Sequence, residues 1–187
     1  MSTTDPASSE PGPIATTTPK RPRLVFLAAT ALGLGYLPQA PGTWGSLGGL
    51  ALLWVIETLQ QRLAIFQKGI VLPLNPYLWC AVISLLGVWA AGRAEEHLGT
   101  KDPQVVVIDE VSGQMLALLL GPALFEGAVN WKSYLLGFIL FRVFDIWKPY
   151  PARRAEAMPA GWGVMADDWV AGAYAAAGLW VARYFGW

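Results

Sequence analysis

The 187-residue chain has little charge and almost no cysteine or histidine. Only 14% of its residues are charged, the formal net charge is zero, and one cysteine and one histidine occur. A single cysteine excludes an internal disulfide framework and a multi-cysteine metal site. Cys80 stands in the apolar run 78–82, which indicates an inert buried thiol. No basic stripe is interleaved with aromatic residues, so we expect no nucleic-acid partner.

Apolar residues are abundant, at 55% of the chain, against roughly 45–50% in ordinary soluble domains. They gather in the segments 47–56, 77–91, 105–120, 133–147 and 164–185. Each uninterrupted run is shorter than the ~20 residues of a simple spanning helix, but polar ends lengthen most of them. Ten tryptophans fit aromatic anchors at a membrane interface. We therefore expect an all-α, polytopic membrane protein with four or five membrane-embedded helices; a tightly packed soluble helical protein is the alternative.

The N-terminal residues differ from the rest in composition. Residues 1–19 are rich in Ser, Thr and Pro and show no hydrophobic periodicity, which is typical of a disordered tail. We expect this tail to cover residues 1–23 and one membrane-embedded domain to cover residues 24–187. Basic residues at 20, 21 and 23 precede the apolar run 24–29, and a late signal peptide is the alternative interpretation of that pattern.

Glycine and proline are dense over residues 33–46, which favours an ordered turn or a re-entrant loop. Thr43 and Ser46 are candidate N-caps for a helix that starts near Leu47. Backbone amides at such a helix start can hold an anion. A capped helix without any ligand explains the same residues.

Three charges occur at the end of the fourth apolar segment. Arg142, Asp145 and Lys148 are spaced three apart, which places them on one face of a helix. Pro149 should end that helix. Charge is costly in or beside hydrocarbon, so an ionisable cluster there indicates function. Internal ion pairing, with Arg142 and Lys148 neutralising Asp145, is the alternative.

Two other apolar segments share an aspartate followed four residues later by glycine. Asp109 precedes Gly113 and Asp168 precedes Gly172. Four residues make about one helical turn, and small residues let membrane helices approach closely. Two such helices can bring their aspartates into one polar pocket. Close packing without catalysis is the alternative for the glycines.

Acidic residues interrupt three apolar segments, and clustered carboxylates repel one another unless a cation lies between them. Oxygen-only coordination suits Mg²⁺, which is often completed by a substrate phosphate. Nearby arginines and lysine can bind that phosphate. The carboxylates are Asp109, Glu110, Asp145, Asp167 and Asp168, and the cations are Arg142, Lys148, Arg153 and Arg154.

Several other phosphatase chemistries are excluded by the sequence. Leu86 occupies the position six after Cys80 where a cysteine-dependent phosphatase needs arginine, and the lone His97 lacks the flanking residues of histidine-dependent lipid phosphatases. Neither Asp-x-Asp nor Asp-Gly-x-x-Ala-Arg occurs. Metal-assisted attack by water on a phosphomonoester, with a carboxylate as the base, remains.

Four segments, taken together and in order, resemble the phosphatidylglycerophosphatase A family. They are residues 35–47 (GYLPQAPGTWGSL), 108–113 (IDEVSG), 141–151 (FRVFDIWKPYP) and 161–172 (GWGVMADDWVAG), and the likeness covers about residues 24–185. Ala160 departs from the family, which often has glycine there, and residues 99–102 lack a frequent histidine. The resemblance implies a multi-pass protein of the bacterial inner membrane with its site facing the cytoplasm. It also implies Mg²⁺-dependent removal of the terminal phosphate of the membrane phospholipid phosphatidylglycerophosphate, giving phosphatidylglycerol.

The resemblance also implies roles for the candidate residues. The carboxylates would form the metal and base set, and Arg142 and Lys148 would hold the phosphate charge. Thr43 and Ser46 would contact the terminal phosphate, while Arg153 and Arg154 would face lipid headgroups. Among these residues, those expected to act in catalysis are Asp109, Glu110, Asp145, Lys148 and Asp168. A metal- or proton-coupled transporter is the alternative function, and a structural membrane scaffold is a third interpretation.

Overall fold

The computed structural model describes residues 22–66, 75–121 and 131–186. Its elements are α1 (Arg23–Ala29), the 3₁₀ turn η1 (Leu34–Tyr36), α2 (Pro41–Phe66), α3 (Pro76–Leu98), α4 (Ile108–Leu119), α6 (Trp131–Trp147), α7 (Ala152–Ala155) and α8 (Gly161–Tyr184). These three ranges contain no strand, which confirms the all-α prediction. The predicted disordered tail falls almost wholly outside the described residues.

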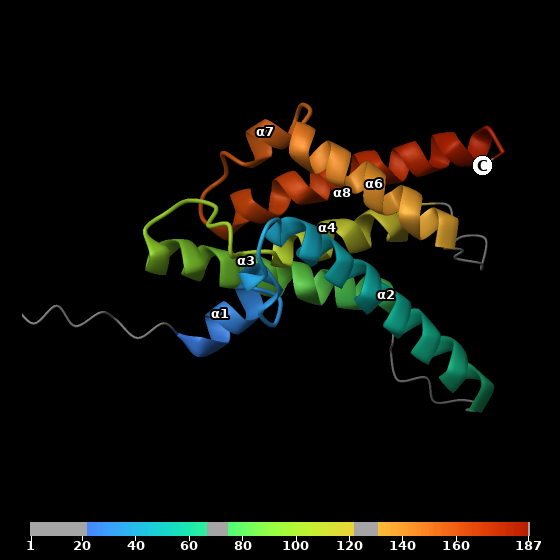
Figure 1. Cartoon of the computed structure of the whole chain (residues 1–187), viewed down its shortest axis with the longest axis horizontal. Helices are drawn as coiled ribbons and strands as arrows, with labels where there is room; N and C mark the ends of the chain where they lie inside the picture. Colours follow the sequence, from blue (N-terminus) through green and yellow to red (C-terminus); the bar gives the residue numbers. More distant parts are fainter. Residues whose placement is uncertain (1–21, 67–74, 122–130, 187) are drawn as a thin grey trace, which may run out of the picture.

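Helix α4 lies at the centre of the fold (Figure 1). It packs against α8, α2, α3 and α6, and most of its residues are buried. Cys80 of α3 is buried against it, as predicted, with its thiol 3.8 Å from the carbonyl oxygen of Ser112. Because neighbours surround α4, the polar side chains of this helix lie in the protein interior.

Helices α4 and α8 cross at two glycines. A Cβ atom added to Gly172 would lie 2.6 Å from the carbonyl oxygen of Gly113, and one added to Gly113 would lie 2.8 Å from that of Asp168. Neither position has room for a side chain, so the two backbones touch. The predicted close approach of the two Asp-x-x-x-Gly segments is confirmed, and it brings Asp168 beside the first turn of α4.

The start of α2 differs from the prediction. This helix begins at Pro41 rather than near Leu47, so Thr43 and Ser46 lie inside it and their assignment as N-caps is wrong. The fixed φ of proline and its missing N–H suit the first turn of a helix, which explains the early start. Ser46 instead donates a hydrogen bond through Oγ to the carbonyl oxygen of Gly42, at 2.9 Å. Helix α6 ends at Trp147, ahead of Pro149, as predicted.

Helix α3 is the one described helix that is long and apolar enough, by length and composition, to cross a membrane. The predicted number of four or five membrane helices is therefore not confirmed by this criterion. Large apolar side chains nevertheless face outward on several helices, including Trp54, Leu85, Trp131 and Ile146, each at least 60% exposed.

Candidate active site

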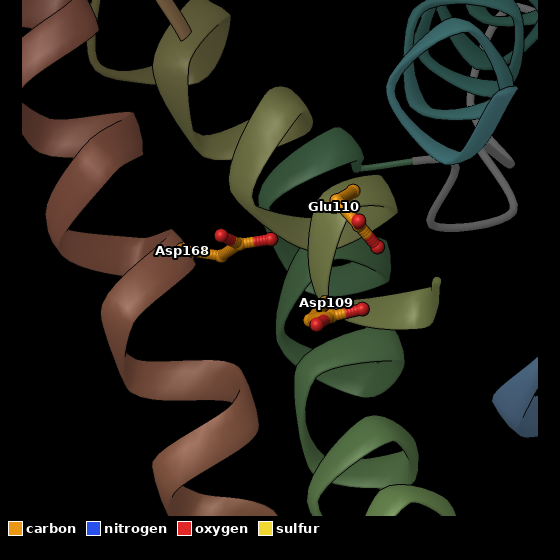
Figure 2. A group of neighbouring side chains, drawn as sticks. All are labelled: Asp109, Glu110 and Asp168. Atoms are coloured by element: carbon orange, nitrogen blue, oxygen red, sulfur yellow. The ribbon is translucent and has the colours of Figure 1, made fainter. Parts of the chain in front are cut away.

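Three carboxylates converge where α4 meets α8, and we call Asp109, Glu110 and Asp168 the carboxylate cluster. One ligand atom from each lies within 4.8 Å of those of the other two. Asp109 and Glu110 extend from the first turn of α4, and the Asp168 side chain points toward them from α8 (Figure 2). Asp109 is 6% exposed and Asp168 is 3% exposed. The structure thus brings together three of the five predicted acidic ligands.

Each member of the carboxylate cluster has a buried oxygen atom without a hydrogen-bond partner among the described residues. These atoms are Oδ1 of Asp109, Oε2 of Glu110 and Oδ2 of Asp168. Burying unpaired carboxylate oxygens is costly, and mutual repulsion adds to that cost. A cluster of oxygen donors with free lone pairs suits a hard divalent cation such as Mg²⁺. The residues therefore fit the predicted metal.

Local structure places Glu110 at the cluster. Acidic residues are favoured in the first turn of a helix, where backbone N–H groups are free and the helix dipole is positive. Helix α2 lies directly against Glu110 because it carries glycine at the contacts. A Cβ atom on Gly42 would collide with Oε1 of Glu110, and one on Gly45 would lie 2.8 Å from the carbonyl oxygen of Val107. Part of the Gly/Pro-rich stretch thus serves to pack α2 against the site.

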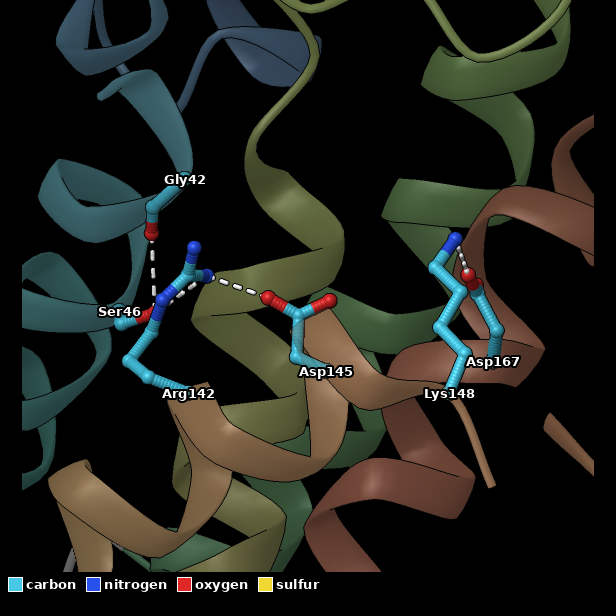
Figure 3. A network of polar contacts seen from close by, with 6 residues as sticks. All are labelled: Gly42, Ser46, Arg142, Asp145, Lys148 and Asp167. Atoms are coloured by element: carbon cyan, nitrogen blue, oxygen red, sulfur yellow. Dashed lines mark hydrogen bonds and ion pairs between the residues drawn. The ribbon is translucent and has the colours of Figure 1, made fainter. Parts of the chain in front are cut away.

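Arg142 and Asp145 of α6 form an ion pair at the edge of the cluster (Figure 3). Nη1 of Arg142 donates to Oδ2 of Asp145 at 2.5 Å and to Oγ of Ser46 at 3.4 Å. Asp145 is close enough to Glu110 and Asp168 to repel both electrostatically. Both members of the pair are largely shielded from solvent, with side-chain exposures of 19% and 14%. Predicted site residues from α2 and α6 therefore adjoin the carboxylate cluster.

Lys148 pairs with α8 instead of joining the other two charges of α6. Its Nζ lies 2.6 Å from Oδ2 of Asp167 (Figure 3). The same atom lies 3.4 Å from Oε2 of Glu156. The prediction that it shares one helical face with Asp145 is wrong, because α6 ends at Trp147 and Lys148 takes a left-handed φ of 47°. Burial by itself lowers the pKa of Lys148, but the hydrogen bond and charge of Asp167 outweigh it and raise the pKa above its ordinary value. Lys148 is therefore a firmly held cation.

Asp167 belongs to this second ion pair. Its Oδ2 accepts from Lys148, and its carboxylate is not part of the three-residue cluster. The predicted role of Asp167 as a metal ligand stays a prediction. The two neighbouring aspartates of α8 therefore have different partners: Asp168 belongs to the carboxylate cluster, and Asp167 is bound to Lys148.

Three predicted residues, Thr43, Arg153 and Arg154, are not members of the carboxylate cluster. Arg153 and Arg154 are exposed on α7, and Arg154 donates to the Tyr150 hydroxyl at 3.0 Å and stands 4.9 Å above its ring. Thr43 is half-buried on α2, one residue after Gly42. Their predicted contacts with phosphate and headgroup remain predictions.

Two residues of this region were missed at the sequence level. Glu156, a partner of Lys148, lies in a polar stretch with no distinctive pattern. Gln114 is completely buried, one turn after Glu110 on α4. Gln114 could have been identified from the sequence, because it is an uncharged polar residue four positions after Glu110 in an apolar segment.

Known proteins are similar to this chain over most of its length. The sequence model of the phosphatidylglycerophosphatase A family matches residues 27–183. Phosphatidylglycerophosphatase A of Haemophilus influenzae is 33% identical over 162 residues, covering 86% of this chain and 90% of that protein. The Escherichia coli K12 protein of the same name is 30% identical over 152 residues, covering 80% and 78%. A Bacteroides thetaiotaomicron protein, provisionally named a phosphatidylinositol-3-phosphatase, is 36% identical over 172 residues, covering 88% and 98%. No solved structure matches.

Proposed function

The chain belongs to the phosphatidylglycerophosphatase A family and is thus a phosphoric monoester hydrolase, and from this premise we propose its substrate and its metal. The substrate is phosphatidylglycerophosphate, whose terminal phosphomonoester is hydrolysed to give phosphatidylglycerol and phosphate in phospholipid biosynthesis. The reaction depends on Mg²⁺. The observation that carries the proposal is the convergence of Asp109, Glu110 and Asp168, each with an unpartnered buried oxygen.

The carboxylate cluster would hold Mg²⁺, with Asp145 as a further candidate ligand at its edge. Mg²⁺ supplies neutralisation of the phosphate charge and polarisation of the phosphoryl group. The five candidate carboxylates outnumber Arg142 and Lys148, the two candidate cations that pair with them, and a doubly charged ion would offset most of this excess negative charge. Asp167 is paired with Lys148 and Asp145 with Arg142, which leaves Asp109, Glu110 and Asp168 as the candidate carboxylates without an ion-pair partner among the described residues.

The side chains of the site provide what hydrolysis of a phosphomonoester needs. A carboxylate of the site accepts a proton from water as the water oxygen attacks phosphorus. The bond from phosphorus to the alcohol oxygen breaks, and the departing alcohol oxygen takes up the proton that the carboxylate accepted from water. Arg142 and Lys148 stabilise the phosphate oxygens, since Arg142 presents a planar fork of donors and Lys148 a fixed positive charge. Ser46 orients Arg142 through its hydroxyl.

The outward-facing apolar surface supports a lipid substrate. Helix α3 has the length and composition of a spanning segment, and large apolar side chains face outward on α2, α3 and α6. A lipid substrate stays with its acyl chains in the bilayer, so an enzyme with an outward apolar surface can meet the headgroup at the membrane boundary. We propose a multi-pass protein of the inner membrane whose carboxylate cluster faces the cytoplasm.

A 3-phosphate ester of phosphatidylinositol is the second candidate substrate, favoured by the name of the Bacteroides relative. Both lipids carry a phosphomonoester on an alcohol whose neighbouring carbon bears a hydroxyl group. The carboxylate cluster suits either ester, because it acts on the phosphate and not on the rest of the headgroup.

The test uses the purified full-length protein in detergent. Release of phosphate is followed from phosphatidylglycerophosphate and from phosphatidylinositol 3-phosphate, with Mg²⁺ and with a chelator. We expect Mg²⁺-dependent release, faster from phosphatidylglycerophosphate. Equal release with chelator would overturn the metal proposal, and no release from phosphatidylglycerophosphate by folded protein would overturn the substrate.

A further inference from the structure

Gln114 is an anomaly in the centre of α4. Its exposed fraction is 0%, yet within the described part of the chain neither Oε1 nor Nε2 of its amide has a hydrogen-bond partner. A buried polar group without a hydrogen-bond partner destabilises a fold, and this amide leaves both a donor and an acceptor unsatisfied. The mechanism proposed above does not use this residue.

Gln114 lies on the face of α4 that bears Glu110. It follows Glu110 by four residues, so the two side chains lie on one face of α4, one turn apart. Helical side chains lean toward the N-terminus, which inclines the Gln114 amide toward the turn that bears Glu110. Gly49 of α2 packs closely against Gln114, since a Cβ atom on Gly49 would lie 3.2 Å from Cβ of Gln114. Oε2 of Glu110 is unpartnered as well.

The chemistry of these two groups restricts what can bind them. Oε1 of Gln114 and Oε2 of Glu110 accept hydrogen bonds, whereas Nε2 of Gln114 donates. A phosphate oxygen would satisfy the donor alone, and a metal cation would satisfy acceptors alone. An O–H group both donates and accepts. Two such groups belong to the reaction: the attacking water, and the hydroxyl next to the phosphate ester of the substrate.

We propose that Gln114 binds an O–H group at the carboxylate cluster and thereby positions either the attacking water or the alcohol part of the substrate. The proposal rests on the proposed function and adds to it a residue that binds either the attacking water or the hydroxyl group next to the phosphate ester. If the hydroxyl belongs to the substrate, Gln114 selects phosphate esters of polyols over esters that lack a neighbouring hydroxyl group.

The decisive variant is Gln114→Met, which keeps the length of the side chain and removes both hydrogen-bonding groups. Leu118→Met is the matched control, because Leu118 is 1% exposed and lies one further turn along the same face of α4. Both variants and the wild type are assayed on phosphatidylglycerophosphate and on its deoxy analogue, in which propanediol replaces the glycerol of the headgroup. Thermal unfolding of each protein is measured without substrate.

We expect Gln114→Met to lower kcat/KM for phosphatidylglycerophosphate about tenfold, as the loss of one or two hydrogen bonds implies. If Gln114 binds the substrate hydroxyl, the wild type prefers the natural lipid and Gln114→Met removes that preference. If it binds water, kcat falls equally for both lipids and KM is unchanged. In either case Tm should stay equal or rise, because the variant removes unsatisfied polar atoms. Leu118→Met should retain wild-type kinetics.

Two results would overturn the proposal. The first is a Gln114→Met enzyme with wild-type kinetics on both lipids. The second is a Tm several degrees below that of the wild type, which would show that the amide has structural partners. This second measurement does not depend on turnover. An inactive wild type would contradict the proposed function, and the Tm comparison would still judge the role of Gln114.

Discussion

Replacing Gly172 by alanine should slow catalysis although Gly172 is not a candidate ligand. Its Cβ position lies 2.6 Å from the carbonyl oxygen of Gly113, which is 0.8 Å short of the 3.4 Å at which ordinary van der Waals contact begins. The obstructing atom belongs to the backbone of α4 and cannot rotate away. Helices α4 and α8 must therefore separate, and Asp168, one turn before Gly172, must move away from Asp109 and Glu110.

The size of the effect follows from these distances. Overpacking typically costs about 1–3 kcal/mol, and exchanging glycine for alanine in a helix returns about 1 kcal/mol. The net loss of stability should be about 0–2 kcal/mol, so the protein still folds. A misplacement of about 1 Å in a catalytic constellation can cost about 100-fold in rate. We expect kcat of Gly172→Ala to fall roughly 10–100-fold.

The assay compares Gly172→Ala with Gly178→Ala, a matched variant in the same helix. A Cβ atom at Gly178 would meet Cδ1 of Leu140 at 3.0 Å, and this half-buried side chain can turn aside. Phosphate release by Gly178→Ala should stay close to the wild-type rate, with equal or slightly higher Tm. Wild-type turnover by folded Gly172→Ala would refute the link between the glycine crossing and the site. An equal loss of phosphate release in Gly172→Ala and Gly178→Ala would refute this link as well.

Further substitutions test the roles of single residues. Asp145→Asn and Asp168→Asn should each abolish phosphate release while circular dichroism and chromatographic behaviour stay unchanged; full activity would remove that residue from the site. Ala160→Gly should raise Tm, because Ala160 has φ 50° and ψ −151°, where a side chain costs about 1–3 kcal/mol; a lower Tm would contradict the strain argument. Lys148→Met should reduce the free energy of unfolding by about 2 kcal/mol, since it leaves the buried Asp167 carboxylate unpaired, and adding Asp167→Asn should recover most of it. Additive losses in that double-mutant cycle would show that the pair is not coupled.

The sequence predicts those parts of the structure that depend on local rules. Proline at 149 ends α6 at Trp147, and the repeated spacing of aspartate and glycine predicts the α4–α8 crossing. The sequence identifies five acidic candidates, and three of them, Asp109, Glu110 and Asp168, converge in the cluster. These predictions rest on residue type and on spacings within single segments.

Predictions fail where partners come from elsewhere in the chain. Arg142 and Asp145 pair as the spacing of three suggests, but Lys148 turns to Asp167, because one left-handed residue after the helix redirects its side chain. Ser46 has the residue type of an N-cap, yet the helix already begins five residues earlier at Pro41. The ion-pair partner of Lys148 and the first residue of α2 depend on tertiary packing, so residue spacing alone does not predict them.

Binding of a divalent ion to the carboxylate cluster is the most direct test of the site. Mn²⁺ accepts the same oxygen ligands as Mg²⁺ and is observable by electron paramagnetic resonance. Titrating the purified wild type should show saturable loss of the free Mn²⁺ signal, competed by Mg²⁺, and the double variant Asp109→Asn/Asp168→Asn should show none. If the folded double variant binds Mn²⁺ as tightly as the wild type, these carboxylates do not form the metal site.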